Sequence, residues 1–110
     1  MKIEVNNATP SQLDFLVLAS DCWSTATLFL VTGKKPPAYS TDWAHGGVII
    51  EREGTSLYLD TNNLWQANIF DGNPAVFGTG VEGSTPLIAA MRCYVASKLG
   101  DEVEIPDELK

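Results

Sequence analysis

The chain has 110 residues, 45% hydrophobic and 19% charged, a balance typical of a single folded domain rather than a disordered segment. Seven Lys and Arg residues against fourteen Asp and Glu residues give a formal net charge of −7. Because nucleic-acid affinity comes mostly from neutralising phosphates, this charge argues against nucleic-acid binding. No apolar run approaches the roughly 18 residues that a membrane span requires, and the first ten residues do not resemble a signal peptide. We therefore expect a cytosolic protein without membrane association.

Two segments carry the signals of helix starts. The first, TPSQ at 9–12, offers a capping Thr, a Pro suited to the first helical position and a Gln placed to complete a capping box. The second, Thr85-Pro86, repeats the capping Thr and the Pro, and Gly100 stands where a C-terminal glycine cap belongs. The broad apolar stripes that follow predict helices over about 10–23 and 86–99.

Four β-prone segments predict strands: ATLFLVT (26–32), VIIERE (48–53), SLYLD (56–60) and LWQANIF (64–70). Turn residues separate the last three, as in an antiparallel meander. The segment from Lys34 to Gly47 and the Gly- and Pro-rich segment 71–84 are predicted to be loops. Together the elements predict one α+β domain spanning 1–110, with a meander of three or four strands packed against the two helices.

The last ten residues, 101–110, hold five acidic side chains and are predicted to form a solvated acidic tail. Cys22 and Cys93 lie far apart in sequence and neither has a CxxC partner, which predicts buried thiols in a reducing compartment.

The residues that could carry catalysis or bind a metal are few. His45 is the only histidine, and neither HExxH nor a paired CxxC nor GxSxG occurs, so we predict no enzyme, no catalytic residues, no metal and no cofactor. A small hydrolase or transferase that uses His45 remains the lowest-ranked alternative. GTGVEG (78–83) matches GxGxxG formally, but the helix is predicted to start after its last glycine, and Glu82 would repel a pyrophosphate.

The stretch STDWAHGG (40–47) is the strongest candidate for a binding loop. An aromatic ring among polar residues and beside two glycines offers a stacking surface for a planar ligand. A helix N-terminus and arginine side chains favour an anion. The predicted ligand-binding residues are Trp43, His45, Gly46, Gly47, Arg52, Ser84, Thr85 and Arg92. The alternatives are that the tryptophan is a core residue, the threonine caps only its own helix and the arginines form ordinary ion pairs.

Two segments, STDWAHGGVIIERE (40–53) and GSTPLIAAMRCYVASKLGDEVEIPDEL (83–109), resemble the phage NinX-like proteins, small accessory proteins of lambdoid phages and prophages. The first helix resembles the family only loosely. Family members often have Pro where this chain has Val48, and usually a longer insert before STDW. The resemblance implies a phage or prophage origin and action in the host bacterial cytoplasm. It implies no biochemical activity, so it assigns no functional residues.

Two hypotheses for function follow. In the first, the chain is a non-enzymatic protein that sequesters a small anionic, nucleotide-derived ligand such as a host immune signal. Trp43 would stack on the base, Gly46-Gly47 would allow close backbone approach, and Ser84-Thr85 with Arg92 would hold phosphate. In the alternative, the chain is an acidic interaction module that binds and modulates a basic host protein. A homo-oligomer is expected in either case, because so small a sheet leaves edges and apolar faces to cover.

Overall fold

The computed structural model describes residues 2–69, 81–100 and 102–105. Over these ranges the helices are η1 (Val5–Asn7, a 3-10 turn), α1 (Pro10–Asp21), α2 (Trp23–Thr32), α3 (Trp43–Glu53) and α4 (Pro86–Leu99). The strands are β1 (Lys2–Glu4), β2 (Thr55–Leu59), β3 (Trp65–Ile69), β4 (Val81–Gly83) and β5 (Glu102–Glu104). The predicted α+β class, with an antiparallel meander packed on helices, is confirmed. None of the helices in the described ranges is both long and apolar enough to span a membrane.

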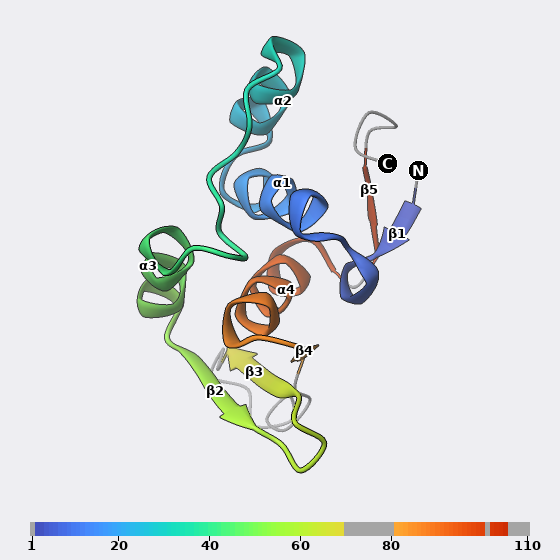
Figure 1. The fold of residues 1–110 in the computed structure, drawn as a ribbon. Coiled ribbons are helices and arrows are strands. Elements are labelled where there is room, and N and C mark those ends of the chain that lie inside the picture. The colour runs from blue at the N-terminus through green and yellow to red at the C-terminus, as the bar shows by residue number, and fades with distance from the viewer. Residues whose placement is uncertain (1, 70–80, 101, 106–110) are drawn as a thin grey trace.

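The core lies between α1 and α4, which stack at the centre of the molecule (Figure 1). Both helices bury long apolar side chains there, chiefly Leu13, Leu16 and Val17 of α1 and Met91 and Val95 of α4. The first helix begins as predicted. The Thr9 hydroxyl accepts a hydrogen bond from the Gln12 backbone N–H, and the Gln12 side chain accepts one from the Thr9 N–H. The capping signals therefore fixed the starts of both central helices correctly.

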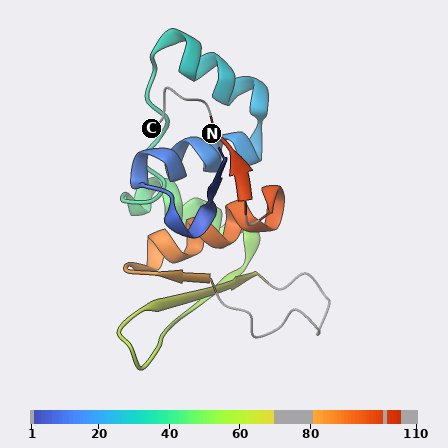
Figure 2. The same ribbon diagram turned by 90° about the vertical axis from the view of Figure 1, so that its right-hand side faces the viewer.

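The three-stranded sheet covers the side of α4 opposite α1, in the order β2-β3-β4 (Figure 2). Its register sets Leu57 opposite Ala67 and Ala67 opposite Val81, on the face that packs against α4. Asp60 organises the turn between β2 and β3, because its carboxylate accepts the N–H groups of residues 62 and 64. The hairpin predicted from 56–60 and 64–70 is thus present as β2 and β3. Residue 70 lies outside the described residues.

Two predicted strands are helices. Residues 26–32 belong to α2, and residues 48–53 belong to α3, which begins inside the predicted loop at Trp43. The start of α3 is fixed by Asp42, whose carboxylate accepts the Ala44 N–H at 2.9 Å. Its end is fixed by Gly54, which adopts the left-handed conformation that suits a C-cap. Between these caps, a helix buries one face of the segment against α4, so packing overrides the β propensity.

The helix predicted over 10–23 is also interrupted. Cys22 adopts an extended conformation, so α1 ends at Asp21 and α2 begins at Trp23 in a new direction. The predicted loop 71–84 contains β4 at its end, and its residues 71–80 lie outside the described part of the chain. The first helix predicted from the sequence is therefore shorter, and a second one follows it at once.

Strands β1 and β5 form a separate two-stranded sheet in which Lys2 pairs with Glu104. Val103 and Ile105 are buried in the core cluster, together with Val5. The prediction of a solvated acidic tail is therefore wrong for residues 102–105, because apolar side chains alternate with the acidic ones and face the core. Residues 101 and 106–110 lie outside the described residues.

Candidate functional site

The exposed side of α3 carries an aromatic ring at its first position. Trp43 is 56% exposed, and its ring lies beside Gly47, where an added Cβ would be 3.6 Å from the ring. With about 100° of rotation per residue, the ring shares this side of the helix with other exposed residues. We call this surface the Trp43 face and define it by Trp43, Ala44, Gly47, Val48 and Glu51.

Gly46 points the other way, into the contact between α3 and α4. A Cβ added there would be 2.2 Å from the Tyr39 carbonyl oxygen and 2.6 Å from Cδ2 of Leu87. A glycine is thus required for α3 to lie this close to the Tyr39 backbone and to Leu87 in the first turn of α4. The contact joins the STDWAHGG segment to the TPLIAAMR segment, the two places that the sequence marked independently. The room left by the missing side chain is filled by Tyr39 and Leu87.

His45 is exposed near the start of α3. Its Nε2 lies 3.9 Å from an Asp42 carboxylate oxygen, and its ring packs edge-on against Tyr39 with 6.3 Å between ring centroids. Within the described ranges, no group of three or more His, Cys, Asp or Glu side chains is arranged to hold a metal ion. In this arrangement His45 serves as a local partner of the Asp42 cap and of Tyr39.

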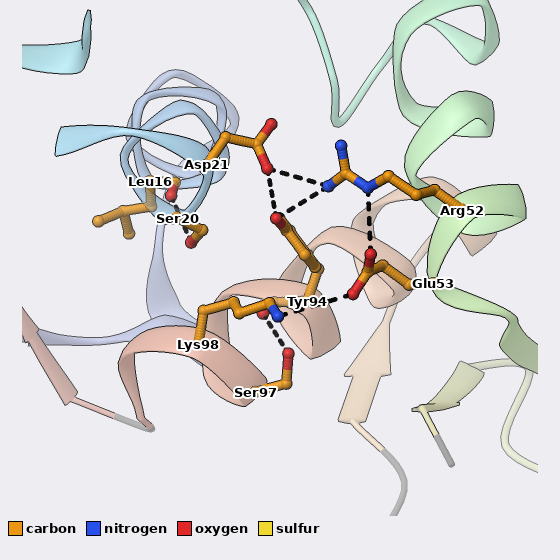
Figure 3. A network of polar contacts seen from close by, with 8 residues as sticks. All are labelled: Leu16, Ser20, Asp21, Arg52, Glu53, Tyr94, Ser97 and Lys98. Atoms are coloured by element: carbon orange, nitrogen blue, oxygen red, sulfur yellow. Dashed lines mark hydrogen bonds and ion pairs between the residues drawn. The ribbon is translucent and has the colours of Figure 1, made fainter. Parts of the chain in front are cut away.

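Arg52 belongs to a polar network that joins three helices (Figure 3). Its Nη2 donates to Asp21 and to the Tyr94 hydroxyl, both at 2.9 Å, and its Nε donates to Glu53 at 3.1 Å. The Tyr94 hydroxyl in turn donates to Asp21. Burial, then the hydrogen bond to Asp21 and the charge of that carboxylate, raise the pKa of Tyr94. Two carboxylates therefore already neutralise Arg52.

At the start of α4, a side chain of the chain itself occupies the predicted anion site. The Thr85 hydroxyl accepts the Ile88 backbone N–H at 3.1 Å, so Thr85 caps its own helix, and Ser84 beside it is exposed. Arg92 lies about 140° around α4 from Leu87, which turns it away from α3. Its Nη1 donates to the Glu82 carbonyl oxygen at 3.0 Å, and burial lowers the pKa of its guanidinium.

The eight predicted ligand-binding residues thus occupy separate places. Trp43, His45, Gly46 and Gly47 share the first turns of α3, and Arg52 lies at its C-terminal end. Ser84, Thr85 and Arg92 belong to the start of α4 and to the side of α4 that meets β4. Gly46 contacts the first turn of α4, but Trp43 is exposed on α3, whereas Arg92 donates to Glu82 of β4.

Sequence reasoning missed three residues that shape this region. Asp21 and Tyr94 complete the Arg52 network from α1 and α4, and no spacing in the sequence signals their approach. Gly83 is buried against α4, where an added Cβ would be 2.4 Å from the Ala89 nitrogen. Gly83 lies in β4, where a glycine often marks close approach of another backbone, but the sequence predicted a loop there.

The comparisons with known proteins place the chain among phage proteins. A family model described as bacteriophage P22 NinX matches residues 11–98. A search of curated proteins found no match to the chain. The matched range runs from the start of α1 almost to the end of α4, and so includes both central helices, the three-stranded sheet and the Trp43 face.

Proposed function

We propose that this chain, which belongs to the bacteriophage P22 NinX family, is a non-enzymatic interaction protein that binds a basic protein of the infected host through the Trp43 face. The observation that carries the proposal is the exposed Trp43 ring beside Gly47. Tryptophan is one of the three side chains enriched among residues that dominate protein–protein binding energy. A rigid helix presents it here, so little conformational entropy is lost on binding.

The charges around the Trp43 face favour a basic partner. Glu51 lies on the face itself, and Asp42 caps the helix beside the ring. The net charge of −7 adds long-range attraction for a positively charged surface and repulsion for nucleic acid or an anionic ligand. We expect this encounter to occur in the host cytoplasm, and its affinity to fall as salt screens the charges.

The test is capture of host-lysate proteins by the tagged chain at low and at high salt. The wild type should retain a stoichiometric basic partner at low salt. Trp43→Ala should weaken binding at least tenfold, because it removes the central aromatic anchor. Tyr58→Ala is a matched control, since Tyr58 on β2 is 50% exposed and lies outside the face.

Unfolding midpoints of both variants should equal that of the wild type, so that lost capture is not lost folding. Equal capture by Trp43→Ala and Tyr58→Ala would show that the Trp43 face is not the contact. If the wild type captures no protein from lysates of the phage's host, the proposal is refuted.

A second candidate function is sequestration of a small nucleotide-derived ligand, and Arg92 is the observation that favours it. Its Nε is buried and has no hydrogen-bond partner among the described residues. No carboxylate in those ranges pairs with its guanidinium. A phosphate bound by the Arg92 guanidinium would supply the missing acceptor.

Thermal unfolding in the presence of nucleotides and cyclic dinucleotides tests this candidate. A ligand at about 100 times its dissociation constant stabilises the protein by about 2.7 kcal/mol, which raises the unfolding temperature by several degrees. Arg92→Gln should abolish the increase. Arg52→Gln, which alters the Asp21 network on another side of α4, should retain it relative to its own unliganded state. If no compound raises the unfolding temperature, this candidate function is refuted.

A further inference from the structure

The outer edge of β2 is a free strand edge that lacks the residues which usually protect one. β2 pairs with β3 on one side only, and no described helix or strand lies beyond it (Figure 1). Its register with β3 has no bulge, and its sequence TSLYL holds neither a charged residue nor a proline. The other outer strands in the described ranges, β1, β4 and β5, have three residues each and carry charged side chains. Because charges, prolines and bulges keep free edges from pairing, β2 is open to a further strand.

The backbone groups at this edge belong to Thr55, Leu57 and Leu59. At the hairpin, the Asp60 N–H donates to the Leu64 carbonyl oxygen at 2.9 Å, so the backbone groups of residue 60 face β3. Bonded and non-bonded positions alternate along an antiparallel pair, so residues 58 and 56 also direct their N–H and C=O groups to β3, and residues 59, 57 and 55 direct theirs outward. No other backbone hydrogen bond among the described residues engages these outward groups. They are placed symmetrically about Leu57.

We propose that β2 pairs antiparallel with β2 of a second copy of this chain, with Leu57 of both copies at a two-fold axis. This register sets Thr55 opposite Leu59 of the second copy, and it pairs every outward N–H and C=O group of both strands. A shift by two residues would leave the groups of one residue on each strand unpaired. The two meanders would form one continuous antiparallel sheet. Because α3 leads into the Thr55 end of β2, the two α3 helices would lie at opposite ends of the paired strands.

The side chains of β2 match this register. On the face away from α4, Tyr58 is 50% exposed and would lie beside the small Ser56 of the second copy. On the other face, Leu59 is 51% exposed and would lie beside Thr55, and the two copies of Leu57 would lie beside each other. A strand of another protein would need a small residue opposite Tyr58 and an apolar one opposite Leu57. A second copy supplies both, so its side chains fill the space across the strands.

The acidic residues at the two ends of β2 do not favour a different occupant. The Glu53 carboxylate accepts the Arg52 Nε–H at 3.1 Å and lies 3.9 Å from the Lys98 ammonium. The Asp60 carboxylate accepts the N–H groups of residues 62 and 64 and the Gln66 side-chain amide. Both carboxylates are therefore engaged within their own chain. Neither is free to recognise a basic strand, and neither opposes a second acidic copy at close range.

The short edge limits the strength of the dimer. Strands of five residues bury less than the roughly 1,200 Å² at which stable specific interfaces begin, so we expect dimers only at about 100 µM and above. Salt should strengthen the dimer, because it screens the repulsion between two chains of net charge −7. Salt should weaken capture of a basic host protein by the Trp43 face, which belongs to α3. The two proposals therefore stand or fall separately.

Hydrogen exchange of the wild type tests the pairing residue by residue. Between about 20 µM and 1 mM protein, exchange of the Thr55, Leu57 and Leu59 amides should slow at least about tenfold. The amides of Ser56 and Tyr58, which face β3, should keep their rates and serve as controls. Slow exchange of the outward amides at both concentrations would show that the chain covers its own edge, and fast exchange at both would show a free edge. Either result would overturn the dimer.

Leu59→Pro removes an outward N–H and places a ring at the edge without removing a hydrogen bond to β3. Light scattering should show this variant as a monomer at concentrations at which the wild type is a dimer. Leu59→Thr is the matched control, because it changes the same side chain but keeps the N–H, and it should still dimerise. Circular dichroism checks that both variants fold. A folded Leu59→Pro that dimerises as the wild type does would overturn the proposal.

Disulfide crosslinking tests the register. Ser56 would lie opposite Tyr58 of the second copy at a non-hydrogen-bonded position, where Cα atoms are about 4.5 Å apart and a disulfide can form. The exposed Cys22 is first replaced by Ser. In that background, an equal mixture of Ser56→Cys and Tyr58→Cys should crosslink mainly as the mixed dimer. Crosslinks mainly between two copies of the same variant would indicate a register shifted by two residues, and would overturn the pairing about Leu57.

Discussion

Gly46 and Gly47 are neighbours on α3 but meet different surroundings. A Cβ at position 46 would be 2.2 Å from a carbonyl oxygen, whereas one at position 47 would touch only the Trp43 ring at 3.6 Å. Gly46→Ala should therefore force α3 away from the Tyr39 backbone and from Leu87 of α4, and reduce the free energy of unfolding by about 1–3 kcal/mol. Gly47→Ala should instead stabilise the protein by up to about 1 kcal/mol, because alanine favours a helix more than glycine does.

Urea unfolding of the two variants, followed by far-UV circular dichroism, measures both effects. The Gly47 variant serves as the control for changing a glycine to alanine in this helix. Equal free energies of unfolding for the two variants would contradict the close contacts of Gly46 with Tyr39 and Leu87.

The pKa of Asp14 leads to a prediction of how the free energy of unfolding changes with pH. Its carboxylate accepts the backbone N–H of Ser40 at 2.8 Å. Burial raises the pKa of Asp14, and this effect exceeds the opposite effect of the hydrogen bonds from Ser40. Because the folded state binds this proton more tightly than the unfolded state, the contribution to stability is largest below about pH 4. It is lost as the pH rises through the folded-state pKa.

Asp14→Asn keeps an acceptor for the Ser40 N–H and removes the titration. Relative to the wild type, the variant should therefore gain stability as the pH rises from about 3 to 7. Urea midpoints measured across that range give the difference between the two proteins. A difference that stays constant with pH, or that changes in the opposite direction, would contradict the raised pKa.

At the scale of the elements, local signals decided what the sequence could predict. The starts of α1 and α4 and the turn between β2 and β3 were predicted because caps and turns involve residues close in sequence. Residues 26–32 of α2 and 48–53 of α3 were predicted as strands because β-branched and apolar residues are frequent in them. Their state is decided by packing on α1 and α4, which a β propensity of about 1 kcal/mol does not capture. For α3, the capping residues Asp42 and Gly54 were local signals of a helix in the sequence.

For the candidate site, the sequence predicted two of the segments but not the contacts made by their side chains. The sequence marked STDWAHGG and the start of α4, and the structure joins them through Gly46 and Leu87. It could not reveal that Arg52 is engaged by Asp21 and Tyr94, which lie 31 and 42 residues away along the chain. Contacts over such separations depend on how helices cross, and no spacing in a single sequence encodes that.

The buried face of α3 can be tested at two adjacent residues. Ile49 is buried and Val48 is exposed. Ile49→Ala should reduce the free energy of unfolding by about 2–4 kcal/mol, because it leaves a cavity between α3 and the core. Val48→Ala should change it by less than about 0.5 kcal/mol. Chemical unfolding of both variants measures the effects, and a larger loss for Val48→Ala would show that the wrong face of the segment is buried.

At the scale of the whole molecule, the last described segment is part of the core. Ile105 is buried with Val5 and Val103, so Ile105→Ala should cost about 2–4 kcal/mol of stability. Glu102 forms an exposed ion pair with Lys2 at 3.5 Å, and Glu102→Ala should cost less than about 1 kcal/mol. Thermal and urea unfolding of the two variants compare them. No loss for Ile105→Ala would restore the prediction of a purely solvated tail.

The pairing of β1 with β5 also constrains the order in which the protein forms. Residues 2–4 are synthesised before α1 to α4, whereas their strand partner, residues 102–104, leaves the ribosome only after these helices have been made. Until then Ile3 and Val5 lack part of the apolar surroundings that bury them in the folded protein. In the nascent chain they are therefore available for non-native apolar contacts. Closing so long a loop is entropically costly and slows folding. The N-terminal strand is therefore expected to be among the last parts of the molecule to reach its final place.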